Sequence, residues 1–130
     1  MAHRIGIVGY SDDSKFDAEP ARAILSEVLG LRALHHPGCS VVSGLTDVGV
    51  PALAYREARR LGMTTVGIAC AKASNYPCFP CDKVKIVGAN WGDESATFLS
   101  SIDELIKVGG GEQSKAEFAS FRGPKEEFDL

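Results

Sequence analysis

The stretch that decides the fold is CSVVSGLTDVGVPALAYREARRLGMTTVGIA (residues 39–69), in which an amphipathic segment separates two short apolar ones. Residues 39–42 and 63–69 are rich in β-branched side chains and bounded by glycine or polar residues, which predicts two buried strands. Between them, apolar side chains recur at the spacing of one helical face: Val50, Leu53, Ala54, Ala58 and Leu61. A strand, a helix and a second strand in this order predict a parallel pair.

The same alternation continues in both directions along the chain. We expect strands at residues 4–8, 83–87, 104–108 and 127–130, and helices at residues 20–29, 93–99 and 114–121. The helix at 20–29 is expected to stop at Gly30, with a loop over residues 31–38, and the alternating strand at 83–87 is expected to be exposed on one face. The pattern predicts one α/β domain over residues 4–130, with a mostly parallel sheet and helices on both faces.

Length and charge exclude several classes of protein. The 130 residues suit one domain, and 14 basic against 17 acidic side chains give a formal net charge of −3. This balance argues against nucleic acid as a partner. No apolar run reaches the ~18–20 residues of a membrane helix, and the N-terminal residues lack the features of a signal peptide. We therefore expect a cytoplasmic protein without a membrane partner.

Small and polar residues follow three of the predicted strands. The carboxyl ends of parallel strands meet on one rim, where ligands of such sheets bind. The candidate ligand-binding residues there are Gly9, Tyr10, Ser11, Ser43, Gly44, Thr46, Asp47, Gly109, Gly110, Gly111, Gln113 and Ser114.

The triplet Gly109–Gly111 is the most specific of these elements. Glycines let a backbone approach an anion closely, and the free N–H groups of a following helix point toward it, so the triplet predicts a phosphate site. Ser114 is expected to cap the helix or to donate its hydroxyl to the phosphate. A plain glycine-rich turn is the alternative. Neither G-x-G-x-x-G nor the P-loop pattern occurs, which argues against an ordinary dehydrogenase or P-loop NTPase.

A second cluster, Trp91, Asp93 and Glu94, follows the predicted strand at 83–87. Trp91 could stack on a base while either carboxylate binds ribose hydroxyls or acts as a general base. Equally, Asp93 could cap a helix and Trp91 could pack against the domain or a partner subunit.

The cysteines and histidines give a weaker signal. Cys78 and Cys81 form the single C-x-x-C, Cys70 is the one further cysteine nearby, and two prolines make this stretch loop-like. Reduced structural thiols are expected rather than a zinc or redox site, so we expect no metal and no cofactor.

The order of motifs resembles the SLOG superfamily, which joins the LOG "lonely guy" nucleotide phosphoribohydrolases, the DprA/Smf proteins and the molybdenum-cofactor carrier proteins. Residues 41–50, with the helix and strand that follow, resemble its middle part. Residues 109–117, GGGEQSKAE, are similar to its G-G-x-G-T-x-x-E signature, with Gln113-Ser114 in place of Gly-Thr. The resemblance covers about residues 4–122.

This resemblance implies a Rossmann-like domain that binds a nucleotide or nucleotide-derived ligand, commonly as a homodimer or tetramer. In LOG enzymes the signature glutamate acts with an arginine to cleave the N-glycosidic bond of a nucleoside 5′-monophosphate. Glu117 falls on that position and is the candidate catalytic residue, whereas no arginine aligns and Arg56, Arg59 and Arg60 are only nearby candidates.

Three hypotheses follow from the residues and the resemblance. The first is a sensor or carrier that binds a phosphorylated, nucleotide-like small molecule at the rim. The second is a LOG-like phosphoribohydrolase that uses Glu117. The third is an interaction domain whose pocket no longer binds a ligand.

Overall fold

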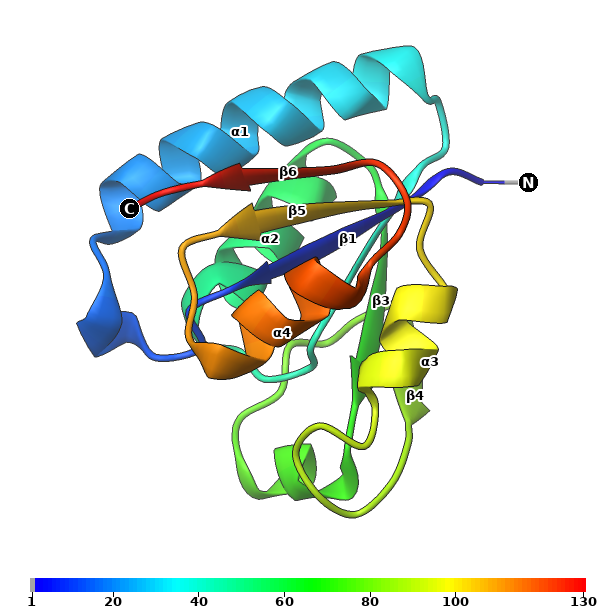
Figure 1. Cartoon of the computed structure of the whole chain (residues 1–130). Coiled ribbons are helices and arrows are strands. Elements are labelled where there is room, and N and C mark those ends of the chain that lie inside the picture. Colours follow the sequence, from blue (N-terminus) through cyan, green and yellow to red (C-terminus); the bar gives the residue numbers. More distant parts are fainter. Residues whose placement is uncertain (1) are drawn as a thin grey trace.

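A six-stranded sheet forms the centre of the structure, a computed structural model that describes residues 2–130 (Figure 1). The strands are β1 (Arg4–Gly9), β2 (Ser40–Ser43), β3 (Thr64–Ala69), β4 (Lys83–Ile86), β5 (Glu104–Val108) and β6 (Lys125–Phe128). The helices are α1 (Ala18–His35), α2 (Gly49–Arg60), α3 (Ser95–Ser100) and α4 (Glu112–Ser120), with short 3-10 helices η1 (Asp13–Lys15) and η2 (Ala71–Asn75).

The strand order is β4-β3-β2-β1-β5-β6, and each neighbouring pair is parallel. The expectation of a mostly parallel sheet is therefore confirmed, and the pairing is parallel throughout the described strands. Crossover connections between parallel strands place helices on the faces of the sheet. The result is an α/β domain of Rossmann-like form.

Helices cover both faces of the sheet, as expected. On one face α1 and α2 pack against strand side chains such as Ile5, Ile7 and Val41. On the other face, α3 and α4 contribute Phe98 and Phe118 to a cluster with side chains that point the opposite way along the same strands. Each central strand thus buries alternate residues on opposite sides, which explains why its sequence is almost continuously apolar.

Several element boundaries predicted from the sequence differ from the structure, among them those of α1 and β6. Helix α1 continues through Gly30 to His35, because a glycine in a helix costs only about 1 kcal/mol and the last turn is tied to the sheet. The tie is Arg32, whose Nε lies 2.9 and 3.0 Å from the two carboxylate oxygens of Glu104. Strand β6 begins at Lys125, two residues before the predicted start.

Strand β4 differs from expectation in its exposure. Its four residues are exposed on both faces, including Val84 and Ile86. The prediction of one buried face rested on the alternation of polar and apolar residues in this strand, whereas the connection from β3 to β4 contains only the short η2. Without a covering helix, this edge of the sheet stays open to solvent.

Among the residues that the structure describes, none of the helices combines the length and the apolar character that crossing a bilayer requires.

Tyr55 on α2 joins the helix to the ends of two strands. Its side chain is fully buried, and its ring packs on Phe79 with 5.0 Å between ring centroids. The hydroxyl oxygen lies 2.7 Å from the carbonyl oxygen of Gly44 and 2.9 Å from that of Val66, to which it donates its proton. Burial raises the pKa of this hydroxyl well above its usual value, so it remains a donor.

Tyr55→Phe keeps the ring and removes this donor. Because two buried carbonyl groups then lose their shared partner, we expect the free energy of unfolding to fall by about 1–2 kcal/mol, measured by urea denaturation. Tyr76→Phe is the matched control, since Tyr76 is 54% exposed, and it should change stability by less than about 0.5 kcal/mol. Equal stabilities of the Tyr55 variant and the parent would show that the hydroxyl does not stabilise the fold.

Candidate functional site

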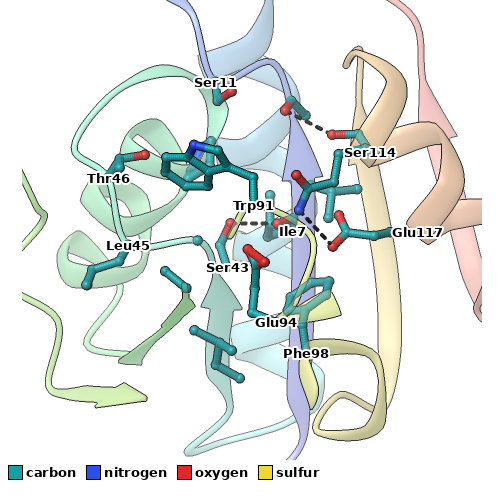
Figure 2. Close-up of a pocket in the computed structure, with 17 residues that line it drawn as sticks. Ile7, Ser11, Ser43, Leu45, Thr46, Trp91, Glu94, Phe98, Ser114 and Glu117 are labelled. Atoms are coloured by element: carbon teal, nitrogen blue, oxygen red, sulfur yellow. Dashed lines mark hydrogen bonds between the residues drawn. The ribbon is translucent and has the colours of Figure 1, made fainter. Parts of the chain in front are cut away.

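The candidate site lies where the strand order reverses. From β1 the chain adds β2 on one side and β5 on the other, and Gly9 at the end of β1 pairs with Val108 at the end of β5. In open parallel sheets such a reversal leaves a crevice beyond the carboxyl ends of the strands. The structure has a pocket at this crevice, which encloses about 690 Å³ of unoccupied space, part of it open to solvent (Figure 2).

Ten of the residues predicted from the sequence line this pocket. They come from the ends of β1 and β2, the segment before α3, and the first turns of α4: Gly9, Ser11, Ser43, Gly44, Thr46, Trp91, Glu94, Gln113, Ser114 and Glu117. Residues more than 100 positions apart thus meet in one place. Ser114 Oγ donates to the carbonyl of Gly9 at 3.1 Å, which closes the rim between β1 and α4.

The other six predicted residues do not line the pocket. Tyr10 stacks on Phe16, Asp47 pairs with Arg56 at 3.0 Å, and Asp93 accepts from the N–H groups of two residues before it in the same loop. Asp93 therefore fixes the loop that carries Trp91 and Glu94. The remaining three, Gly109, Gly110 and Gly111, form the turn that sets the start of α4.

The turn before α4 has the conformation that glycine favours. Gly109 and Gly110 have φ values of +61° and +120°, and a Cβ on Gly110 would lie 2.7 Å from the Cβ of Ser114. Gly111 is the N-cap residue, so the prediction that Ser114 caps this helix is wrong. The helix begins at Glu112, two residues earlier than predicted, and its hydroxyl-bearing residue lies inside the first turn.

The N-terminus of α4 has free donors beside the pocket, whereas the first two amides of α2 are already engaged. In α4 the N–H of Lys115 makes the first bond within the helix, to Gly111 O at 3.0 Å, and Gly111 gives no side-chain cap. The amides of residues 112–114 are therefore free, as a bound anion requires. In α2 the amides of Gly49 and Val50 already donate to Asp13 and to Tyr10 O.

Two buried carboxylates face the same pocket. Glu94 and Glu117 are 6% and 8% exposed, and Glu117 accepts hydrogen bonds from Ser95 Oγ at 2.8 Å and Gln113 Nε2 at 3.5 Å. Burial raises the pKa of Glu117, and the negative charge of Glu94 raises it further, against the two hydrogen bonds that lower it. Glu117 thus favours its protonated form more than an exposed glutamate does.

No lysine or arginine lines the pocket in the part of the chain that the structure describes. The three arginines considered from the sequence are engaged elsewhere. Arg56 pairs with Asp47, Arg60 with Glu57, and Arg59 donates to Pro80 O and lies over the Phe79 ring, 4.6 Å from its centroid. A phosphate in this pocket would be held by backbone amides and hydroxyls.

Trp91 lies at the mouth of the pocket. Its side chain is 47% exposed, and Figure 2 shows the indole above the carboxylate of Glu94, between the rim residues Thr46 and Ser114. Its ring centroid lies 6.0 Å from that of Tyr76, tilted by 52°. The indole is thus available to a planar ligand rather than packed into the core.

The sequence did not identify the apolar part of the pocket. Seven lining residues were missed, and they belong to β1 and β3, to the segment after β2, to the start of α2 and to α3: Ile7, Val8, Leu45, Pro51, Ile68, Ala69 and Phe98. In the sequence these residues are indistinguishable from core positions. Only their place at strand ends, next to the polar residues of the rim, could have identified them.

The cysteines do not contribute to the pocket. Cys39 and Cys70 are buried, Cys81 is partly buried and Cys78 is exposed, and all four are free thiols. Within residues 2–130 no three His, Cys, Asp or Glu side chains are grouped so that they could hold a metal ion.

Comparison with known proteins shows that the fold of this chain is similar to that of several solved structures. No protein-family model matches the sequence, and a search of curated proteins finds no match. Among solved structures, the chain is similar to a molybdenum cofactor binding protein from the phototrophic bacterium Rippkaea orientalis, with a TM-score of 0.82 and 20% identity over 100% of this chain and 78% of that one.

Two structures of the molybdenum cofactor carrier protein from Chlamydomonas reinhardtii are also similar. One has a TM-score of 0.78 at 22% identity, covering 100% of this chain and 78% of that one, and the other 0.65 at 23%, covering 92% and 70%. At 20–23% identity these likenesses show a shared fold, and it is the Rossmann-like fold that the resemblance to the SLOG superfamily implied. The chain has the Rossmann-like architecture of these carrier proteins.

The raised pKa of Glu117 makes stability depend on pH. Because the folded state favours the protonated carboxyl, its contribution is complete below the pKa of the unfolded chain and is lost as pH rises through the folded pKa. Glu117→Gln is neutral at every pH and keeps an acceptor for Ser95. The Tm of this variant minus that of the parent should therefore increase from about pH 4 to about pH 8.

The control for this measurement is Glu27→Gln, the same change at an exposed position on α1. Its Tm difference should stay constant over the same range. A constant difference for Glu117→Gln as well would mean that Glu117 titrates like an exposed glutamate.

Proposed function

We propose that this chain binds a nucleotide or a nucleotide-derived, phosphorylated small molecule at the carboxyl ends of β1, β2 and β5, and acts as a carrier or sensor of that ligand. The observation that carries the proposal is the free N-terminus of α4, which opens onto the pocket that Trp91 and apolar side chains line. Backbone amides suit a phosphate and the apolar walls suit a ring. The printed names of the structural neighbours, a cofactor binding protein and carrier proteins, support a carrier.

Ligand binding should raise the melting temperature. The panel comprises nucleoside mono- and diphosphates, ADP-ribose, NAD and molybdopterin-like compounds. A ligand at ~100 times its Kd adds about 2.7 kcal/mol, which for a domain of this size is roughly 5–15 °C. A flat response across the panel would contradict the proposal and favour an interaction domain without a ligand.

Gly111→Asp tests whether α4 holds the phosphate. At this N-cap position φ is −96°, and nothing lies within 4 Å of an added Cβ, so aspartate fits and can accept from the free amides. We expect the free protein to be as stable as the parent or slightly more so, because the new carboxylate accepts hydrogen bonds from the free amides of α4. We expect the Kd for the ligand that the panel identifies to rise by at least about ten-fold, because the carboxylate occupies those amides and repels the phosphate.

The matched control is Gly30→Asp, which adds the same charge on α1 at a position with equally open space. It should leave ligand binding unchanged. If Gly111→Asp also leaves the Kd unchanged, the phosphate does not bind at α4.

A second candidate function is LOG-like hydrolysis of a nucleoside 5′-monophosphate, in which water adds at C1′ and the base leaves with a proton. The observation that favours it is the buried carboxyl of Glu117 at the pocket, with its raised pKa. Incubation with AMP would then release adenine and ribose 5-phosphate, and Glu117→Gln would lower the rate by at least ~100-fold. A carrier leaves AMP intact, and chromatography distinguishes the two.

The remaining expectations about partners stay predictions. They are self-association as a homodimer or tetramer, a location in the cytoplasm, and no binding of nucleic acid. Leu31 and Leu34, 46% and 73% exposed on α1, are the apolar side chains that a second copy would cover.

A further inference from the structure

The proposed carrier or sensor function gives no role to the two glutamates that line the pocket, Glu94 and Glu117. A phosphorylated ligand is anionic, and a pocket that places two carboxylates beside it, with no lysine or arginine in its lining, makes no electrostatic provision for more negative charge. Figure 2 shows both carboxylates pointing toward the space below the Trp91 indole. These groups need a counterpart on the ligand.

Each carboxylate has an oxygen without a partner. Glu94 accepts through Oε1 from the N–H of Gly92 at 2.7 Å, and Glu117 accepts through Oε2, so Glu94 Oε2 and Glu117 Oε1 have no hydrogen bond within residues 2–130. Within residues 2–130, every fully buried side-chain oxygen or nitrogen has a hydrogen-bond partner. These two oxygens have none, so they are not fully buried and must border open space. Both residues are more than nine-tenths buried and line the pocket, so that space is the pocket.

We propose that Glu94 and Glu117 read the donor edge of the ligand's ring, a ring N–H next to an exocyclic amino group, as in guanine or a 2-amino-4-oxo pterin. This inference rests on the proposed function. Ionised carboxylate oxygens only accept hydrogen bonds, so the edge must offer donors. The amino and ring N–H groups of a 2-amino-4-oxo heterocycle lie side by side and supply two.

The surroundings favour a ring over the hydroxyls of a ribose. Val8, Ile68 and Phe98 line the same pocket, and the indole of Trp91 lies at its mouth. Apolar walls fit the faces of a heterocycle, and an aromatic side chain stacks on it. A divalent cation is less suited, because the described residues offer no third acidic, histidine or cysteine ligand there.

Glu94 is the specificity-determining residue in this arrangement. In Glu94→Gln the amide oxygen can keep the hydrogen bond from Gly92, which directs the amide NH₂ into the pocket. The amide NH₂, a hydrogen-bond donor, then takes the place of Oε2 of Glu94, which is an acceptor. The variant should therefore disfavour the 2-amino group and favour a carbonyl at the same position of the ring.

The experiment compares nucleotides that differ at this edge. GMP carries the 2-amino group, IMP lacks it, XMP has a carbonyl there, and AMP presents a ring acceptor instead of a ring N–H. Trp91 is the only tryptophan of the chain, so its fluorescence reports binding directly. Pterin and lumazine, which differ in the same amino-to-carbonyl change, test whether a pterin is the source of the edge.

In the parent protein we expect GMP to bind at least about ten-fold more tightly than IMP or AMP, the factor that one hydrogen bond to a charged group supplies. In Glu94→Gln we expect this preference to disappear and XMP to bind more tightly than GMP. Glu27→Gln, exposed on α1, should retain the parent's preference. A pterin that binds more tightly than GMP, with the same loss in Glu94→Gln, would assign the edge to a pterin.

Equal binding of GMP, IMP and AMP would overturn the inference and leave the proposed function intact, and an equal loss for all three in Glu94→Gln would assign the carboxylates to ribose hydroxyls. Binding of none of the nucleotides or pterins would contradict the proposed function itself.

Discussion

Contact between backbones at the end of β1 determines the form of the rim. A Cβ on Gly9 would lie 2.4 Å from Val108 O, and one on Gly49 would lie 2.2 Å from Tyr10 O, so neither position has room for a side chain. The end of β1 is thus held between the start of α2 and the end of β5. Because α2 is held so close, the amides of Gly49 and Val50 already donate within the protein, whereas the amides of residues 112–114 at the start of α4 have no partner in the described part of the chain.

Much of the rim could be predicted from the sequence, because the residues that strand ends require are chemically distinct. Glycine and serine after an apolar run mark the point where the backbone leaves the sheet, and three such points in a parallel sheet must converge. The predicted Gly9, Ser43 and Ser114 do line one pocket. The sequence could not distinguish Glu94, which lines the pocket, from Asp93, which holds the loop, since adjacent residues carry the same chemistry and differ only in direction.

Other parts of the structure depend on long-range contacts that the sequence does not reveal. The extension of α1 beyond Gly30 rests on Arg32 reaching Glu104, 72 positions away in the chain. The exposure of β4 arises because only the short η2 connects it to β3 and no helix there covers it. Arg56 and Arg60, by contrast, are engaged by nearby carboxylates, Asp47 and Glu57, so neither is free to act in the pocket.

The departure from the SLOG signature has a structural meaning at Gln113. Where that signature has glycine, this chain has a side chain whose amide donates to Glu117 Oε2 at 3.5 Å. The glutamate is therefore partly covered by its own helix, together with Ser95 at the start of α3. A shared fold leaves such details of the site free to change, and with them the chemistry that the site performs.

The lack of a basic side chain in the pocket has a consequence for the kinetics of capture. Proteins that attract phosphates through lysine or arginine gain association rate from long-range attraction and lose it as salt is added. Here the formal net charge is −3 and the pocket holds two carboxylates, so the phosphorylated ligand proposed above would meet repulsion until it reached the amides at the start of α4. Added salt would screen that repulsion and speed association, which is the reverse of the usual dependence.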